Sequence, residues 1–433
     1  MVLLLPIYNW FLVIGLNENN MPLTLADTEA LDLVDPLKNA KSEFSIPENT
    51  IYLNSNSLGV MPKAVPERIQ DFTTREWSND LIGSWNHNKW FEAPYRIGDK
   101  IARIIGASDS EVVATDCASI NLYKLVVAAL NARPGRTRIV TEAGNFPTDL
   151  YMLQSVAESF AGDVEIVAVQ DRNKIIEEID ERTALVVLTD VHYKTSHLLD
   201  RKAITERTHQ HGALILWDLC HSAGALPVDL NELEADLAVG CTYKYLSGGP
   251  GAPGFIFVAK HLQNQLTQPL QGWWGHAEPF KFVDDYAPTE GIGRFLCSTQ
   301  SVLALTAMEV GIDVFLKYEM KDIRRKSQKL GQLFIELIEE RCAGFQFTIA
   351  SPRDPEQRGS HVALAHDNAY AIMQALIKHK VIGDFRAPDT IRFGFSPLYM
   401  SYADIWNAVT ILEEVMQTAQ WDRKEFQIVN SVT

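Results

Sequence analysis

An aspartate and a lysine, each placed directly after an apolar run, are the residues best suited to do chemistry together. Asp218 ends the segment LILWD, and Lys244 follows DLAVGCTY and precedes a loop dense in glycine. If the two runs are neighbouring parallel strands, both side chains lie at the carboxyl edge of one sheet, where open α/β folds bind ligands. A lysine amine can bind an aldehyde covalently, and a carboxylate beside a pyridine nitrogen keeps that nitrogen protonated. The ordered pair therefore predicts a pyridoxal phosphate site, although each residue alone is also typical of a strand end or a solvated surface.

The surroundings of Lys244 favour the functional interpretation. It lies between Tyr243 and Tyr245, and its glycine-rich loop allows the backbone to approach a ligand closely. A catalytic lysine must be neutral for part of the time in order to remove a proton. We therefore expect burial beside a cationic cofactor to lower its pKa.

The pattern of apolar residues indicates an α/β fold. Short runs rich in Val and Ile alternate with helical patterns such as 119–131 and 203–211, which is typical of crossover units and a mainly parallel sheet. Strands are expected at 111–115, 138–142, 164–169, 184–190, 213–218, 237–241 and 255–258. Beyond residue 300 helical patterns dominate, at 301–318, 321–341 and 402–417, which predicts a second, smaller α+β domain.

The chain is expected to divide into four parts. These are an apolar extension at 1–20, a segment at 21–60 that packs on the small domain, a large cofactor-binding domain at 61–310 and a small C-terminal domain at 311–433. The apolar start is shorter than a bilayer span of ~20 residues. A secretory signal needs a positively charged beginning, and no Lys or Arg precedes Lys38. Met21 opens an ordinary acidic sequence, so we expect translation to start there.

Composition excludes several classes of protein. The formal net charge of -16 and the absence of a basic stripe disfavour nucleic-acid binding, and no membrane association is expected. Five cysteines, odd in number and without C-x-x-C spacing, indicate neither a disulfide framework nor a zinc site. We expect no metal and a reducing, cytoplasmic location.

Six segments carry a resemblance to a known family. YLNSNSLG, FPTD, WDLCH, TYKYL, GWWGH and IRFGFSPLY occur in this order, over nearly everything after Met21. Together they resemble kynureninase of the bacterial type, a fold-type I pyridoxal-phosphate family. The resemblance implies a mainly parallel seven-stranded sheet flanked by helices, a smaller α+β domain, and a homodimer with its active site at the subunit interface. It also implies hydrolysis of L-kynurenine, and more weakly of 3-hydroxy-L-kynurenine, to anthranilate and L-alanine in tryptophan degradation and NAD biosynthesis.

The resemblance assigns covalent attachment to Lys244 and an acid–base role to Tyr243. Phe146 would stack on the cofactor ring, and the start of a helix at Ala118 and Ser119 would bind the phosphate. The full expected cofactor shell consists of Ala118, Ser119, Phe146, Asp149, Thr189, Asp218, His221, Tyr243, Lys244, Trp273 and Thr299. Each also has a structural explanation, such as a core Phe, a helix cap or a packed histidine.

Some of the expected contacts come from elsewhere in the assembly or concern the substrate. Trp273 and Thr299 resemble residues that reach the phosphate from the partner subunit. Arg392 resembles the arginine that grips the substrate's carboxylate, a task suited to its planar fork. Trp85 and Ser57 are expected to complete the substrate site.

The preferred aryl group can be argued from two positions. Animal relatives that prefer 3-hydroxykynurenine carry His and Asn where this chain has Trp85 and Thr299. A bulky Trp85 offers stacking and no hydrogen-bond partner for the extra hydroxyl, so plain kynurenine is expected to be preferred. Ser298 departs from the glycine common in bacterial members, which weakens the inference.

Three alternatives share the fold. A cysteine desulfurase or selenocysteine lyase would use the same lysine and aspartate but needs an activated cysteine. Cys297, in RFLCSTQ, is the candidate, and no base is apparent beside it. An aminotransferase would leave the expected water-handling residues without a purpose. A non-catalytic pyridoxal-phosphate-binding protein would have no need to retain Lys244.

Overall fold

A large sheet organises the first of two lobes in the computed structural model, which describes residues 23–428. The expected extension at 1–20 lies outside these residues. The large sheet has seven strands in the order β2-β8-β7-β6-β5-β3-β4, and every neighbouring pair is parallel except those that β8 makes with β2 and β7. Its strands are β2 (Val112–Thr115), β3 (Arg138–Glu142), β4 (Glu165–Val169), β5 (Thr183–Thr189), β6 (Leu214–Asp218), β7 (Leu237–Gly240) and β8 (Gly254–Val258). The expected strands and the mainly parallel sheet are confirmed.

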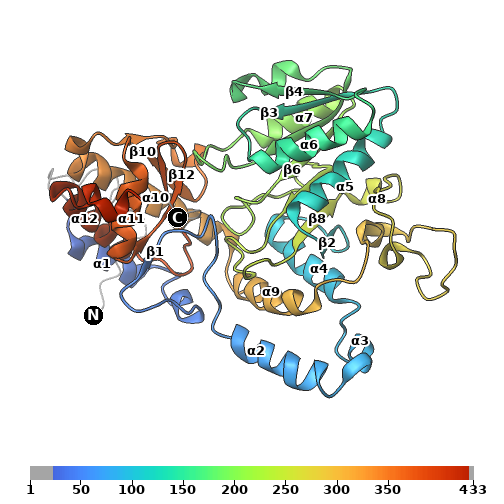
Figure 1. The fold of residues 1–433 in the computed structure, drawn as a ribbon, viewed down its shortest axis with the longest axis horizontal. Coiled ribbons are helices and arrows are strands. Elements are labelled where there is room, and N and C mark those ends of the chain that lie inside the picture. Colours follow the sequence, from blue (N-terminus) through green and yellow to red (C-terminus); the bar gives the residue numbers. More distant parts are fainter. Residues whose placement is uncertain (1–22, 429–433) are drawn as a thin grey trace, which may run out of the picture.

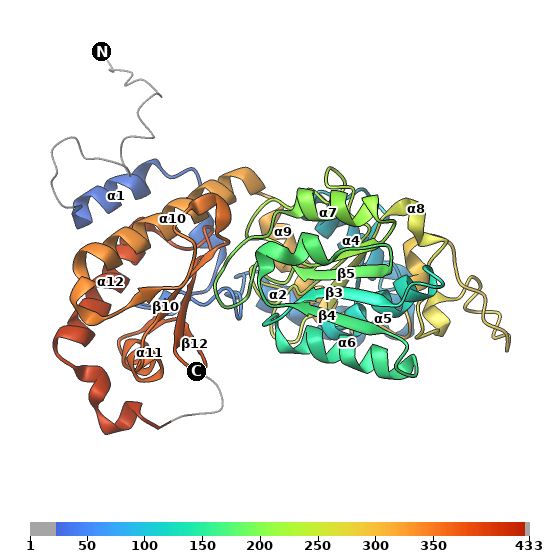
Figure 2. The same ribbon diagram turned by 90° about the horizontal axis from the view of Figure 1, so that it is seen from above.

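Helices cover both faces of this sheet. Figure 2 shows the strands between α7 on one side and α6 on the other. Helix α5 packs against α6 and against the central strands. Strands buried on both faces are continuously apolar, which explains why every residue of β5 and β6 is buried. The helices of this lobe are α4 (Ala93–Ile105), α5 (Ala118–Asn131), α6 (Pro147–Ser159), α7 (Arg201–Gln210), α8 (Lys260–Gln263) and α9 (Val302–Phe315).

The second lobe, which carries the labels β10 and β12 in Figure 1, is built on a four-stranded antiparallel sheet in the order β12-β13-β10-β9. Its strands are β9 (Thr348–Ile349), β10 (His361–Ala365), β12 (Asp384–Arg386) and β13 (Thr390–Gly394). Its helices are α10 (Met320–Arg341), α11 (Ala369–Lys378) and α12 (Tyr402–Gln417). Helices α9, α10 and α12 lie where helical patterns were expected.

The N-terminal segment packs on this second lobe. Helix α1 (Leu25–Val34) lies against α12, and the carboxylate of Asp32 accepts the backbone N–H groups of Tyr402 and Ala403 at 2.7 and 3.1 Å. A negative charge at the start of a helix is favourable. Further on, β1 (Ile51–Tyr52) pairs in parallel with β11 (Val381–Ile382). The expected domain limits at residues 60 and 310 remain predictions.

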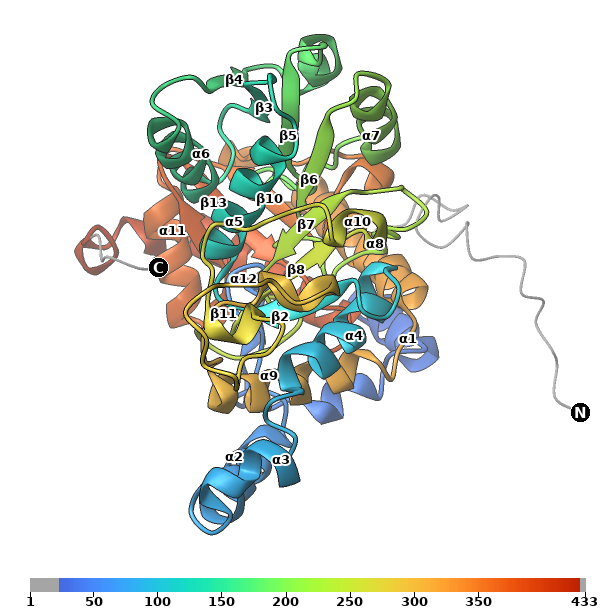
Figure 3. The ribbon, with the colours of Figure 1, turned by 90° about the vertical axis from the view of Figure 1, so that its right-hand side faces the viewer.

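Two parts of the chain project from the large lobe. One holds α2 (Val65–Asp71) and α3 (Ser84–His87), as Figure 3 shows, and the other is the segment between α8 and α9, at the right of Figure 2. Within residues 23–428, no helix is long and apolar enough to cross a membrane.

Candidate active site

The central strands of the large sheet bring the expected residues to one edge. Thr189 is the register partner of Asp218, and Asp218 is the partner of Val239, so β5, β6 and β7 end side by side. Lys244 lies on the turn that follows β7, and its Nζ is 3.0 Å from Nε2 of His221. The structure therefore brings the lysine, the aspartate and the histidine together at the carboxyl edge.

The charge environment of Lys244 differs from the expected one. Burial by itself lowers the pKa of the ammonium group, but the acidic groups around it, chief among them the Cys241 thiol, raise it above its ordinary value. In the protein alone the pKa of Lys244 is therefore raised, and the lowering expected beside a cationic cofactor stays a prediction. These acidic groups favour the protonated form of the amine.

His221 is a neutral imidazole. Burial, and then the positive charge of Lys244, holds its pKa well below the ordinary value. Because the Lys244 ammonium donates to Nε2, the proton of the neutral ring belongs on Nδ1, and this buried nitrogen has no hydrogen-bond partner. His221 thus touches the lysine directly and is not merely a packed core residue.

Two buried carboxyl groups face each other beside the lysine. Asp149, in the first turn of α6, hydrogen-bonds Asp218, and burial together with the charge of Asp218 raises the pKa of Asp149 well above its ordinary value. The hydroxyl of Thr189 lies 3.4 Å from both carboxyl groups and donates to Asn145 Oδ1 at 2.5 Å. Asn145 also contacts Asp149 at 3.3 Å and was not singled out from the sequence, although it directly precedes the FPTD segment.

This donor set fits pyridoxal phosphate. A protonated pyridine nitrogen would supply the positive charge that the Asp149–Asp218 pair needs. The ring of Phe146 stands perpendicular to Tyr193 and is 43% exposed, so part of it is accessible to a ligand. Helix α5 begins at Ala118, and its N-cap, Cys117, provides no side-chain cap. The backbone N–H groups at this helix start suit a phosphate.

The YLNSNSLG segment contacts the turn that carries Lys244 through Gly59. The N–H of Gly59 donates to the carbonyl oxygen of Tyr243 at 2.8 Å. A Cβ atom at Gly59 would lie 2.2 Å from the carbonyl oxygen of Lys244 and 2.6 Å from the Ser247 hydroxyl. Only glycine permits this approach, which places the N-terminal segment directly on the lysine turn.

Arg392 is buried at the same crevice and is held by an acid that sequence reasoning missed. Its Nε donates to Asp384 Oδ1 at 2.7 Å, its Nη2 donates to Asp384 Oδ2, and Nη2 also contacts the Ser57 hydroxyl at 3.1 Å. Asp384 and Arg392 are register partners on the antiparallel strands β12 and β13. The signal was therefore present, because an acid and a base that flank a short turn can pair across a hairpin.

Three expected residues lie elsewhere in the single chain. The Trp85 ring packs against Trp274, with centroids 5.5 Å apart, and Trp273 contacts Trp274 and Phe280 on the projecting segment. Thr299 is exposed. Within the described part of the chain, no hydrogen bond or ring contact joins these three residues to Lys244 or Asp218.

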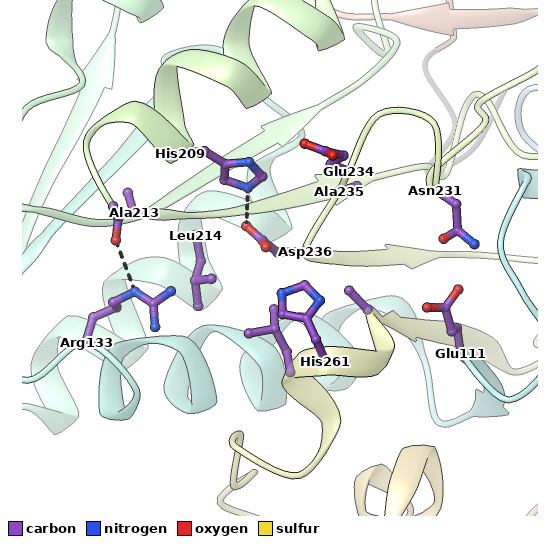
Figure 4. Close-up of a pocket in the computed structure, with 13 residues that line it drawn as sticks. Glu111, Arg133, His209, Ala213, Leu214, Asn231, Glu234, Ala235, Asp236 and His261 are labelled. Atoms are coloured by element: carbon purple, nitrogen blue, oxygen red, sulfur yellow. Dashed lines mark hydrogen bonds and ion pairs between the residues drawn. The ribbon is translucent and has the colours of Figure 1, made fainter.

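A different hollow, of about 520 Å³, lies at the opposite edge of the large sheet (Figure 4). Two of the carboxylates that line it are already bound by the chain itself. Asp236 accepts from His209 Nε2 and from the N–H of Ile215, both at 2.9 Å, and Glu111 accepts the N–H groups of Ser108 and Lys260. None of the expected site residues lines this hollow.

Comparison with known proteins defines the class. Residues 95–296 match the family of Cys/Met metabolism PLP-dependent enzymes. Cysteine desulfurases from Thermococcus onnurineus and Escherichia coli superpose with TM-scores of 0.74 and 0.75, covering 88% and 89% of this chain and 98% and 99% of theirs. At 18% and 17% identity, these two establish the fold alone. The fold is therefore that of PLP-dependent enzymes, as expected.

The family follows from sequence relatives. Residues 323–412 match the kynureninase C-terminal domain. Kynureninases of Pseudomonas fluorescens and Burkholderia pseudomallei are each 46% identical over 414 residues, which is 95% of this chain and 100% of each relative. The chain belongs to the kynureninase family, and the resemblance seen in the six motifs is confirmed. Likeness to desulfurases at far lower identity gives that alternative no comparable support.

Proposed function

We propose that the protein is a pyridoxal-phosphate-dependent kynureninase, which hydrolyses the bond between the β and γ carbons of L-kynurenine to release anthranilate and L-alanine. The observation that carries this proposal is the cluster of Lys244, His221 and Asp218 at the carboxyl edge of the sheet, in a chain of this family. A pure binding protein would gain nothing from a buried amine placed against an imidazole and an acid pair.

The cofactor would be held from three sides. Lys244 would attach to its aldehyde, Asp218 would bind the pyridine nitrogen, and Phe146 would cover one face of the ring. Asp149, Thr189 and His221 complete the polar contacts near Asp218. The backbone at Ala118 and Ser119 binds the phosphate at the start of α5, helped by Tyr243.

Bound pyridoxal phosphate would supply an electron sink. It would accept the negative charge left when the α proton is removed and when the bond between the β and γ carbons breaks. The Lys244 amine carries the α proton of the substrate at Nζ and returns a proton to the alanine fragment. His221 Nε2, at 3.0 Å, orients this amine. Asp218 keeps the ring nitrogen protonated throughout.

Tyr243 is the second proton carrier and serves the addition of water to the γ carbonyl. Burial raises the pKa of its phenol to about 12, so the hydroxyl is neutral at physiological pH and able to donate. From its place next to Lys244, with Nζ 5.8 Å from the centre of its ring, Oη can serve water addition to the γ carbonyl. Arg392, fixed by Asp384 and Ser57, lies where the substrate's carboxylate would bind.

We also propose a homodimer whose partner subunit supplies Trp273 and Thr299 to the phosphate. Large apolar side chains are exposed on both projecting parts of the large lobe, as patches that bind partners usually are. They are Trp77, Leu81, Ile82, Phe280, Phe282 and Val283. Burying these patches against a second copy would also place Trp85, with Trp90 and Trp274 packed around it, beside the active site of that copy. A cytoplasmic location and a role in tryptophan degradation and NAD biosynthesis belong to the same proposal.

Substrate preference follows from Trp85. Its ring packs edge-on against Trp90 and Trp274, with centroids 5.7 and 5.5 Å away, and offers an aromatic surface with no acceptor for a 3-hydroxyl. We propose that plain kynurenine is preferred. Comparing kcat/KM on the two substrates tests this, and a clear advantage for 3-hydroxykynurenine overturns it.

The decisive experiment is an assay of the holoenzyme with L-kynurenine, following anthranilate by its fluorescence. Wild-type protein is expected to form anthranilate and L-alanine in equal amounts, and Lys244→Ala to form neither. Borohydride trapping followed by peptide mapping is expected to label Lys244. Labelling of another amine, or sulfide release from cysteine without anthranilate formation, overturns the proposal.

A further inference from the structure

Arg392 alone has little capacity left for a ligand. An arginine has five N–H donors. Nε is used by Asp384, both donors of Nη2 are used by Asp384 and Ser57, and one donor of Nη1 is used by the Tyr193 carbonyl at 2.5 Å. Bidentate binding of a carboxylate by Arg392 would therefore require some of these hydrogen bonds to break.

A second guanidinium lies beside it. Nη2 of Arg386 is 2.9 Å from Asp384 Oδ2 and donates to the Ser57 hydroxyl at 3.2 Å, so both arginines share one acid and one hydroxyl. One further donor, on Nη1, is used by the carbonyl of Phe385. Arg386 retains its Nε donor and one Nη1 donor, and its side chain is 33% exposed where that of Arg392 is 1% exposed.

Arg386 lies at the same crevice as Arg392. Both guanidinium groups donate to the Ser57 hydroxyl and both are bound to Asp384. The charge of Arg386 also acts on Tyr243 and His221, so the reactive residues lie within its electrostatic reach.

The charges in this group do not balance. Arg386 and Arg392 are both cationic, and among residues 23–428 Asp384 is the one carboxylate bound to them. Two cations that share one carboxylate leave a net positive charge, so the group is suited to receive one additional anion. An amino acid substrate brings one carboxylate.

We infer that Arg386 is a second carboxylate-binding residue, which receives the substrate's carboxylate together with Arg392, while Asp384 and Ser57 position both guanidinium groups. The inference rests on the proposed function for the location of the substrate. It assigns the selectivity for an α-carboxylate over an amide or a bare amine to Arg386. The second cation strengthens the binding of a charged carboxylate and does not strengthen that of a neutral amide.

The test compares holoenzyme binding of L-alanine, the product, with that of L-alaninamide by isothermal titration calorimetry. Arg386→Gln is expected to weaken L-alanine by about 10- to 100-fold and L-alaninamide by less than about 3-fold. Arg386→Lys keeps the charge and is expected to recover part of the affinity. Arg182→Gln, which removes an exposed arginine paired with Asp180, is the matched control and is expected to bind both ligands like wild type.

Kinetics give a second readout. KM for L-kynurenine is expected to rise in Arg386→Gln with kcat reduced much less, because a binding contact is lost and no proton carrier is changed. Equal weakening of both ligands, or no weakening of either, overturns the inference. If Arg386→Gln does not fold, Arg386→Ala, which also removes the charge, decides, and unchanged discrimination between acid and amide combined with an unchanged KM overturns the inference. A wild type that binds both ligands but makes no anthranilate defeats the proposed function and leaves the assignment of Arg386 to be judged on the binding data.

Discussion

A single methyl group at Gly59 is expected to damage the lysine turn. In Gly59→Ala, the new Cβ would lie 2.2 Å from the carbonyl oxygen of Lys244 and 2.8 Å from Cα of Ser247. These are backbone atoms, which cannot swing aside as a side chain would. Overpacking of this kind costs ~1–3 kcal/mol, and weakening the hydrogen bond from Gly59 to Tyr243 adds ~1 kcal/mol. We expect a total loss of ~2–4 kcal/mol, concentrated at the cofactor site.

Urea unfolding of the holoenzyme, followed by both cofactor absorbance and protein fluorescence, measures this effect. Gly344→Ala is the matched control, because a Cβ there meets nothing within 4 Å. It is expected to leave the midpoint unchanged or raise it slightly, since alanine restricts the unfolded chain more than glycine does. If Gly59→Ala unfolds at the wild-type midpoint and keeps its cofactor absorbance, the close approach inferred from the structure is wrong.

Three further predictions concern protons. Tyr243→Phe is expected to lower kcat by ~10²–10⁴-fold with little change in cofactor absorbance, and normal turnover would remove Tyr243 from the reaction. Asp149→Asn is expected to stabilise the cofactor-free protein at neutral pH, because burial and Asp218 raise the pKa of Asp149 and so penalise its charged form; this gain in melting temperature should shrink as pH falls toward 4, and a gain independent of pH would contradict it. His209→Gln is expected to destabilise the protein at pH 5.5 and progressively less as pH rises, because the hydrogen bond to Asp236 raises the pKa of His209 and the stability this gives is lost above that pKa; parallel pH profiles would disprove this.

The large sheet and its reactive edge were predictable because the signals are local. Runs such as LILWD are apolar throughout, as doubly covered strands are, and a strand ending in an acid places that acid at the carboxyl edge. Thr189, Asp218 and Lys244 meet for this reason. Antiparallel β8 was not foreseen, since its apolar run has no feature that specifies direction.

Other parts of the site depend on contacts between distant residues. Gly59 reaches the lysine turn, and Ser57 reaches Asp384, from distant parts of the sequence, and no periodicity encodes such approaches. The raised pKa of Lys244 in the protein alone was not foreseen, because it depends on the acidic groups that folding gathers around the amine. The expected contributions of Trp273 and Thr299 require a second subunit, so they remain predictions.

The stretch from Ile51 to Gly59 is attached to both lobes at once. At one end it pairs with β11, in the middle Asn54 bridges to Gly394 of β13, and at the other end it is bonded to Tyr243. It therefore connects the two lobes over a few residues. A rotation of the small lobe relative to the large one would displace the backbone that carries the reactive amine. Substrate capture by the arginines of the small lobe would in this way be mechanically linked to the alignment of Lys244.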